Sequence, residues 1–227
     1  IKPILYAHAI EQGFPQNKLI LDAPVAFRGA KKGRDWAPKN FSGTFKGEMT
    51  LRKALAISQN IPAVRLIEML GPASVVRFGQ DLGITSSLAP NLSLALGSSE
   101  VTLLELTAAY GVFANRGQWI KPFGLLEVDT HNGRVLWQVK PQKKVAMSRE
   151  GAAVITDMLT GVIKEGTGKK AAVLKRPLAG KTGTTDQYKD ALFIGFSPSI
   201  ATGVWVGLDR NSSLGNLETG ARAALPI

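Results

Sequence analysis

One stretch of the sequence, residues 178–185, places a single lysine among small and hydroxyl-bearing residues. It reads LAGKTGTT, and six of its eight residues are small or carry a hydroxyl. Gly180 and Gly183 have no side chain, so a substrate or another backbone can approach a strand closely there. Backbone N–H groups, hydroxyls and the ammonium of Lys181 could then face a carboxylate or an amide carbonyl lying along the strand. The alternative is an ordinary edge strand with a solvated lysine, because short motifs recur by chance.

Two further groups of reactive side chains accompany this strand. Lys2 lies in the first turn of a segment that is apolar on most faces, which predicts a buried helix over residues 1–12. The serine–glutamine–asparagine triplet at 58–60 falls between two predicted helices, because Pro62 begins the second one. By position alone, Lys2 could reach solvent from a helix end and the triplet could be a plain turn.

In this order the three groups resemble the S-x-x-K, S-x-N and K-T-G motifs of penicillin-binding proteins and class A β-lactamases. The chain resembles in particular the transpeptidase domain of class A, bifunctional penicillin-binding proteins, and the resemblance covers nearly all of its length. The matching segments are 47–52, 58–64, 95–97, 100–102, 109–115, 166–168, 179–185, 190–191 and 220–222.

The resemblance also indicates what the chain does not contain. The nucleophilic serine of the family lies three residues before the motif lysine, and the lysine that fits is Lys2. We therefore expect this serine, and the first strands of the sheet, to precede Ile1, and a closing helix to follow Ile227. The chain is then a fragment truncated at both ends and unable by itself to form the acyl-enzyme. A sheet without its first strands has an open edge, so we expect marginal stability or association of the fragment.

The resemblance implies a role in acyl transfer for each matching side chain before the K-T-G strand. A serine hydroxyl needs a nearby base. Lys2 would be that base, uncharged because of burial near a second cation such as Lys181. Ser58 would relay a proton to the leaving amine, and Asn60 would hydrogen-bond the substrate amide and orient Lys2.

The K-T-G strand is implied to bind the substrate. Lys181, Thr182, Gly183 and Thr184 would receive the terminal carboxylate of a peptide or of a β-lactam. The backbone N–H of Thr184 would form half of an oxyanion hole, and the N–H of the nucleophilic serine would form the other half.

The family reaction cross-links peptidoglycan. A donor stem peptide ending in D-Ala-D-Ala acylates the serine and releases D-Ala, and the amine of a neighbouring peptide then takes the acyl group. β-Lactams acylate the same serine. The implied partners are stem peptides, β-lactams and an upstream glycosyltransferase domain. The implied location is extracytoplasmic, with a membrane anchor that the chain lacks.

Two other functions fit the same motifs. A serine β-lactamase is disfavoured because no Glu-x-x-Leu-Asn segment is present to position a deacylating water. A non-catalytic, penicillin-recognising sensor or scaffold domain would differ only in lacking the serine before Lys2.

Charge permits a third function but does not favour it. The net charge is +11 and the pI near 10.0, which allows an anionic partner such as nucleic acid, a membrane or a polymer surface. The basic residues lie in small groups without interleaved aromatic residues, so nucleic-acid binding is disfavoured. Those groups are Lys31, Lys32 and Arg34; Lys143 and Lys144; Lys169 and Lys170; and Lys175 and Arg176.

Composition excludes several kinds of site. The absence of cysteine excludes disulfides and thiolate metal sites. His8 and His131 have no partner at metal-ligand spacing, so we expect no metal and no cofactor. The uninterrupted apolar runs are too short to span a membrane.

Local signals place the elements that would position the site. Gly13 should end the first helix, and Thr50 and Ser148 should cap two later ones. Thr102 and Glu105 form a capping-box pattern. Residues 14–48 are expected to form a long surface loop with one short strand at 19–21, and residues 92–99 a Gly/Ser loop. Long ordered loops are often functional.

These elements are expected to form one α+β domain over residues 1–227. The segments 190–196 and 201–208 are apolar on both faces, which predicts central strands covered on both sides. With 178–185 they would form an antiparallel sheet flanked by helices, and the resemblance makes this fold β-lactamase/transpeptidase-like. In chain order the parts are a helical region about 1–118, a hairpin about 119–140, and a helix with sheet strands about 148–227.

Overall fold

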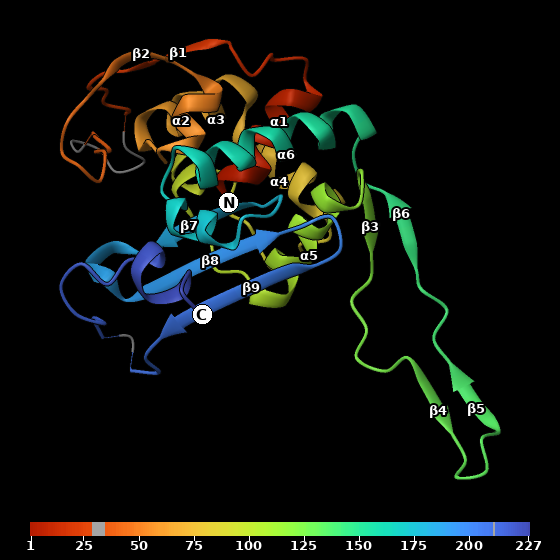
Figure 1. The fold of residues 1–227 in the computed structure, drawn as a ribbon. Coiled ribbons are helices and arrows are strands. Elements are labelled where there is room, and N and C mark those ends of the chain that lie inside the picture. Colours follow the sequence, from red (N-terminus) through yellow and green to blue (C-terminus); the bar gives the residue numbers. More distant parts are fainter. Residues whose placement is uncertain (29–34, 211) are drawn as a thin grey trace.

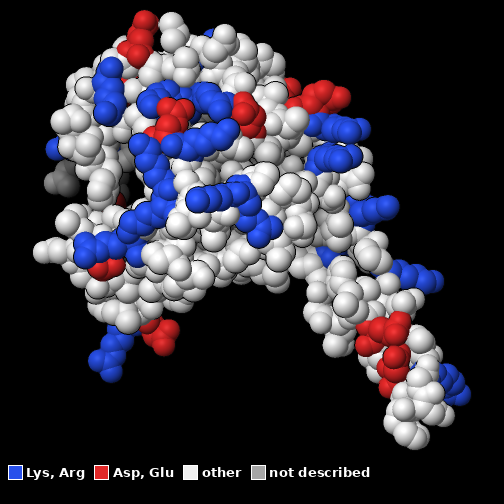
Figure 2. Space-filling model, viewed as in Figure 1, with Lys and Arg blue, Asp and Glu red and all other residues white. Residues whose placement is uncertain are grey.

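The computed structural model describes residues 1–28, 35–210 and 212–227. Helices gather in one layer beside a three-stranded sheet, and a long two-stranded arm projects away from both (Figure 1). The predicted mixture of helices and antiparallel sheet is therefore confirmed. The basic group Lys31, Lys32 and Arg34 lies outside the described residues. Other Lys and Arg side chains form separate groups on the visible face, with Asp and Glu between them (Figure 2).

Within the described ranges, six α-helices form the helical layer, and several of their ends agree with the sequence signals. The prediction that Pro62 begins the helix after the 58–60 triplet is wrong, because α3 begins at Asn60 and Pro62 is its third residue, where no intrahelical N–H is needed. Gly13 follows the first helix with a φ of +83°. Thr50 and Ser148 each accept a hydrogen bond from an N–H of the first turn, and Thr102 forms a complete capping box with Glu105. The helices are α1 (Lys2–Glu11), α2 (Leu51–Ala56), α3 (Asn60–Leu70), α4 (Pro72–Asp81), α5 (Leu103–Ala114) and α6 (Arg149–Lys164).

Helix α1 runs through the core. Residues 3–9 are all buried, and the helix packs against α3, α4 and α6. A helix enclosed on all sides has no polar face, which explains why its sequence is apolar all round. Figure 1 shows the N-terminus between the helical layer and the sheet. The core therefore places Lys2 in the interior.

The main sheet is antiparallel and has the strand order β7 (Ala179–Thr184), β8 (Asp190–Phe196), β9 (Ala201–Gly207). Lys181 pairs with Ile194 in its register. Helix α6 packs on β7 and α5 on β8 and β9, and the π-helical turn η4 (Gly220–Ala224) packs on β8. The prediction that residues 201–208 form a central strand is wrong for the described residues. Strand β9 lies at an edge of the described sheet, and Trp205 in it is 46% exposed.

A second small sheet anchors the long loop that precedes the helices. Strand β1 (Leu19–Asp22) agrees with the sequence-based expectation, but its antiparallel partner β2 (Gly47–Thr50) is an addition to it. The loop between them includes an isolated β-bridge between Phe27 and Trp36. A short 3-10 helix, η1 (Leu92–Leu96), occupies the segment expected to be a Gly/Ser loop.

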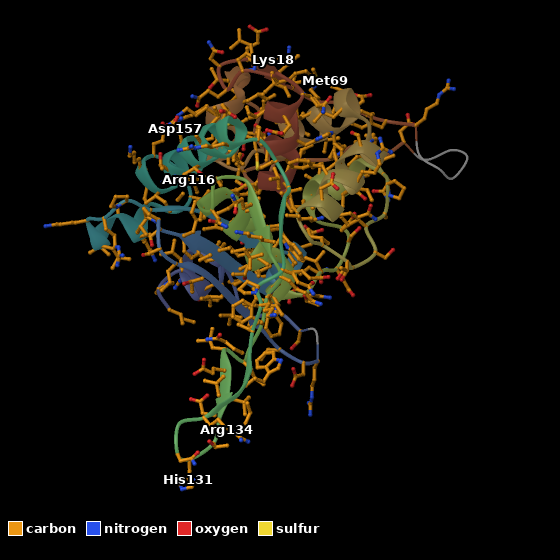
Figure 3. All side chains as sticks on the ribbon, turned by 90° about the vertical axis from the view of Figure 1, so that its right-hand side faces the viewer. Lys18, Met69, Arg116, His131, Arg134 and Asp157 are labelled. Atoms are coloured by element: carbon orange, nitrogen blue, oxygen red, sulfur yellow. The ribbon has the colours of Figure 1, made fainter. Side chains whose placement is uncertain are left out.

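The arm consists of two successive two-stranded ribbons. Strand β3 (Gln118–Ile120) pairs with β6 (Lys143–Val145), and β4 (Glu127–Asp129) pairs with β5 (Val135–Gln138). A turn through Asn132 and Gly133 lies at the tip, where the N–H of Thr130 donates to the carbonyl of Arg134 at 2.9 Å. Figure 3 shows His131 and Arg134 at this end, far from the helical layer.

Candidate active site

The three sequence motifs meet where α1, the turn between α2 and α3, and β7 come together. Ser58 Oγ accepts hydrogen bonds from Lys181 Nζ at 2.8 Å and from Lys2 Nζ at 3.4 Å. Lys2 Nζ also donates to Asn60 Oδ1 at 2.6 Å and to the backbone oxygen of Ser58 at 2.8 Å. The fold thus brings together four side chains that lie up to 179 positions apart in the sequence.

Local backbone geometry directs these groups toward one another. Lys2 is in the first turn of α1, and helical side chains point toward the N-terminal end of their helix. Ser58 has a φ of +62°, in the left-handed region, which lets the chain leave α2 and begin α3 within a few residues. Lys181 is 5% exposed and lies on the buried side of β7. Two lysines therefore enter the interior beside one hydroxyl.

Burial changes the acid–base properties of both lysines. It lowers the pKa of Lys2 well below its usual 10.5, and the charge of Lys181 lowers that pKa further. Burial alone lowers the pKa of Lys181 to about 7. Removing an ammonium from water disfavours the charged form, so an uncharged lysine can exist here near neutral pH. An uncharged amine beside a hydroxyl can accept its proton.

Strand β7 has one edge without a strand partner among the described residues, as the sequence predicted. The hydroxyls of Thr182 and Thr167 form a hydrogen bond of 2.6 Å, and the N–H of Gly220 donates to Thr184 Oγ1 at 3.1 Å. A side chain on Gly183 would come within 3.2 Å of Leu192 Cβ. Both threonine hydroxyls are thus held in place by hydrogen bonds, while the free edge of the strand can pair with an extended peptide.

Sequence reasoning missed the polar residues beneath the 58–60 turn. Asp22, Asn40 and Gln59 are buried, and the side-chain amides of Asn40 and Gln59 both donate to the Asp22 carboxylate. The available signal was the length of the 14–48 loop, which indicated a functional segment. It did not indicate which polar residues of the loop are buried.

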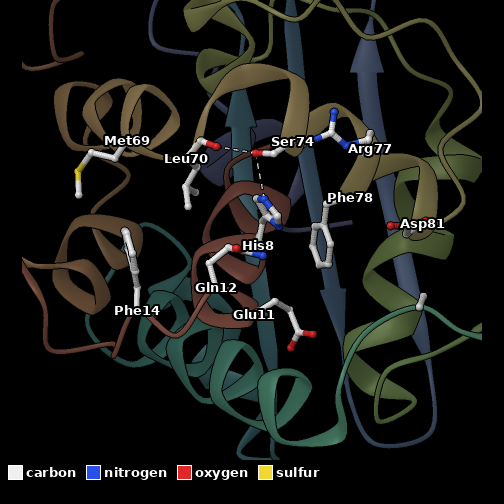
Figure 4. A pocket seen from close by; sticks show the side chains of 11 residues that line it. His8, Glu11, Gln12, Phe14, Met69, Leu70, Ser74, Arg77, Phe78 and Asp81 are labelled. Carbon is white, nitrogen blue, oxygen red and sulfur yellow. Dashed lines mark hydrogen bonds between the residues drawn. The ribbon is translucent and has the colours of Figure 1, made fainter.

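Other polar features lie away from this site. A cavity of about 670 Å³ lies at the opposite end of α1. In its lining, His8 Nε2 and Ser74 Oγ are hydrogen-bonded at 3.1 Å (Figure 4). Burial lowers the pKa of His8 below its usual 6.5.

Among the residues that the structure describes, no group of three or more His, Cys, Asp or Glu side chains could hold a metal ion. No described helix is long and apolar enough to cross a membrane.

The comparisons with known proteins all identify penicillin-binding proteins as similar to this chain. The family model for the penicillin binding protein transpeptidase domain matches residues 1–212. Penicillin-binding protein 1A of Aquifex aeolicus is 46% identical over 227 residues, which are 100% of this chain and 31% of that relative. The chain spans about a third of the length of the curated relatives it matches.

Solved structures show the same similarity. Penicillin-binding protein 1A from Haemophilus influenzae has a TM-score of 0.94 at 30% identity, covering 100% of this chain and 40% of that one. The PonA1 protein from Mycobacterium tuberculosis in complex with penicillin V has a TM-score of 0.79 at 25% identity, covering 93% and 60%.

Proposed function

The chain belongs to the penicillin-binding protein transpeptidase family, and we propose that it forms the acyl-transfer site of a peptidoglycan D,D-transpeptidase. The observation that carries the proposal is the contact of the half-buried Lys2 and the buried Lys181 with the single hydroxyl of Ser58. The donor would be a stem peptide ending in D-Ala-D-Ala. β-Lactams would acylate the same nucleophile.

The nucleophile in this proposal is a serine three residues before Lys2. Residues three apart lie on one face of an α-helix, so this serine would share the face of Lys2.

Acylation would transfer the serine proton to uncharged Lys2 Nζ as the serine oxygen attacks the donor carbonyl carbon. The backbone N–H groups of Thr184 and of the serine would stabilise the negative carbonyl oxygen. The C–N bond would then break, and the proton would pass from Lys2 through Ser58 Oγ to the departing D-Ala amine. In the second half, an acceptor amine would attack the ester and return a proton over the same route to the serine oxygen.

The substrate would lie along the free edge of β7. Its carboxylate would bind the ammonium of Lys181 and the hydroxyls of Thr182 and Thr184, with Gly183 allowing close approach. Asn60 would donate to the substrate amide through Nδ2 while its Oδ1 holds Lys2. Charge-assisted hydrogen bonds to a carboxylate are about twice as strong as neutral ones.

The whole protein would also include parts outside this chain. We propose an upstream glycosyltransferase domain and an N-terminal membrane anchor. The acyl-transfer site would then lie on the extracytoplasmic side of the membrane, where peptidoglycan is assembled.

The test is the intact mass of the full-length protein before and after incubation with benzylpenicillin. The expected result is one penicillin adduct, which peptide mapping places on the serine three residues before Lys2. The variant Lys2→Ala should form the adduct far more slowly, while Lys170→Ala, at an exposed lysine, should react normally.

Other results would each overturn part of the proposal. Absence of any adduct would indicate a non-catalytic, penicillin-recognising domain. Rapid turnover of a chromogenic cephalosporin would indicate a β-lactamase. An adduct mapped to Ser58 would show that the nucleophile lies within residues 1–227 and that the alignment to Lys2 is wrong.

A further inference from the structure

We propose that Asn40, oriented by Asp22, is a positioning residue that fixes the 58–60 turn against Lys2. The proposal rests on the proposed function and adds two residues to the site. Among the described residues, neither side chain is hydrogen-bonded to Lys2, Lys181 or Ser58 Oγ. Both would act through Asn60 and the backbone at the start of α3.

All four hydrogen-bonding positions of the Asn40 amide are occupied, and the residue is 3% exposed. Its Oδ1 accepts from the N–H of Asn60 at 2.9 Å and of Ile61 at 3.2 Å, two groups that the start of a helix leaves unpaired. Its Nδ2 donates to Asp22 Oδ1 at 2.7 Å and to the carbonyl of Thr44 at 2.9 Å. The side chain thus joins α3 to the long loop and to β1.

Asp22 determines which way the Asn40 amide faces. Its carboxylate is 0% exposed and accepts hydrogen bonds from Asn40, from Gln59 Nε2 at 2.8 Å and from the N–H of Lys46 at 3.0 Å. A flipped Asn40 amide would set oxygen against the carboxylate and NH₂ against the N–H groups of α3. Unpaired polar groups are costly in a buried site, so one orientation is strongly preferred.

The loop consequently holds Asn60 at two points. Asn40 Oδ1 accepts a hydrogen bond from the backbone N–H of Asn60, and the carbonyl of Lys39 accepts one from Asn60 Nδ2 at 2.9 Å. With Nδ2 on Lys39, Asn60 Oδ1 faces Lys2 Nζ. The long loop therefore sets both the backbone and the side chain of the residue that orients Lys2. Nδ2 has a second hydrogen for the substrate amide.

The experiment exchanges the carboxylate of Asp22 and the side-chain amide of Asn40. Asn40→Asp sets two carboxylates against each other, and Asp22→Asn places an NH₂ among donors. The double variant, Asp22→Asn with Asn40→Asp, restores a donor–acceptor pair, because the amide at position 22 can donate and the carboxylate at position 40 can still accept from α3. The hydrogen bond to Thr44 is lost and a carboxylate oxygen faces the Thr44 carbonyl instead, so the restoration is partial. The measurement is the second-order rate of benzylpenicillin acylation in the full-length protein, well below each variant's Tm.

We expect Asn40→Asp to acylate about 10- to 100-fold more slowly, since displacements near 1 Å reduce catalysis by such factors. The double variant should recover about tenfold relative to Asn40→Asp. The matched control is Asn91→Asp, because Asn91 caps η1 as an acceptor and keeps its bond from the Leu94 N–H. It should acylate at the wild-type rate.

A purely structural role for Asn40 predicts a lower Tm with unchanged acylation, and that result would overturn the proposal. So would a double variant no faster than Asn40→Asp. Hydrogen exchange at the amides of Asn60 and Ile61 provides a readout that needs no acylation. Protection should fall in Asn40→Asp and return in the double variant. If the wild-type protein forms no adduct, the proposed function fails, and this exchange pattern alone decides the positioning role.

Discussion

At the scale of single residues, the proposed reaction gives the two lysines different charge states. In that proposal Lys2 must be uncharged to accept a proton, while Lys181 must be charged to attract a carboxylate. Both lysines have lowered pKa values because both are removed from water. A bound carboxylate would favour the charged form of Lys181, and that charge would in turn help to keep Lys2 neutral. Substrate binding would thus place the pair in the working protonation state.

The lowered pKa of Lys181 makes stability depend on pH. The folded protein releases the Lys181 proton near pH 7, whereas an unfolded chain keeps it up to the usual 10.5. Between these values the unfolded state binds more protons, so stability should rise as pH increases from about 7 to 10.5. Below pH 7 both states are protonated and this contribution is constant.

Replacing this lysine should remove the effect. Lys181→Met should flatten the increase of the urea midpoint between about pH 7 and 10 relative to wild type. The exposed Lys170→Met should preserve it. If the wild type and Lys181→Met show the same slope, Lys181 does not hold a lowered pKa in the folded protein.

At the scale of elements, the turn between α2 and α3 combines a side chain of the site with an unfavourable backbone conformation. Ser58 contributes its hydroxyl to both lysines and adopts a φ of +62°. A left-handed conformation costs a non-glycine residue about 1–2 kcal/mol. This strain is consistent with a functional position, because strained residues cluster at sites that the surrounding structure holds in place.

The variants Ser58→Gly and Ser58→Ala separate the strain from the hydroxyl. Both lose the hydrogen bonds to the lysines, but glycine adopts the left-handed region freely, so Ser58→Gly should be more stable than Ser58→Ala by about 1 kcal/mol. Both should acylate slowly. At Ser93, whose φ is not positive, the order of glycine and alanine should be reversed. Urea denaturation measures the four variants, and a less stable Ser58→Gly would contradict a left-handed turn.

The elements that could be predicted from the sequence are those whose causes are local. The caps at Thr50 and Ser148 and strands β7 and β8 follow from residues close together in the chain, and all are present in the structure. Strand β2 and the Asp22–Asn40 pair depend on contacts between distant residues, which no local pattern indicates. The position of β9 within the sheet was predicted wrongly, because an apolar segment does not reveal whether a strand pairs with it on both sides.

At the scale of the whole molecule, the arm stands apart from the site. Its outer ribbon exposes large apolar side chains, including Leu125, Leu126, Leu136 and Trp137. A two-stranded ribbon alone is at best marginally stable in water. None of the residues placed in the site belongs to the arm, and Figure 1 shows the arm extending away from the N-terminus, where Lys2 lies.

The arm can be shortened without disturbing its base. The N–H of Lys121 donates to the carbonyl of Gln142 at 2.9 Å, so these two positions are adjacent and a two-residue Asn-Gly turn can join them in place of residues 122–141. We expect the shortened protein to acylate with benzylpenicillin at the wild-type rate and to unfold within about 0.5 kcal/mol of wild type, as for changes remote from packed features. Because the exposed apolar side chains are removed, it should also bind less of a hydrophobic dye. The double variant Leu125→Ser with Leu126→Ser is the control, since it should reduce dye binding while keeping the ribbon. A slower acylation in the shortened protein alone would show that the arm acts on the site through the helices at its base.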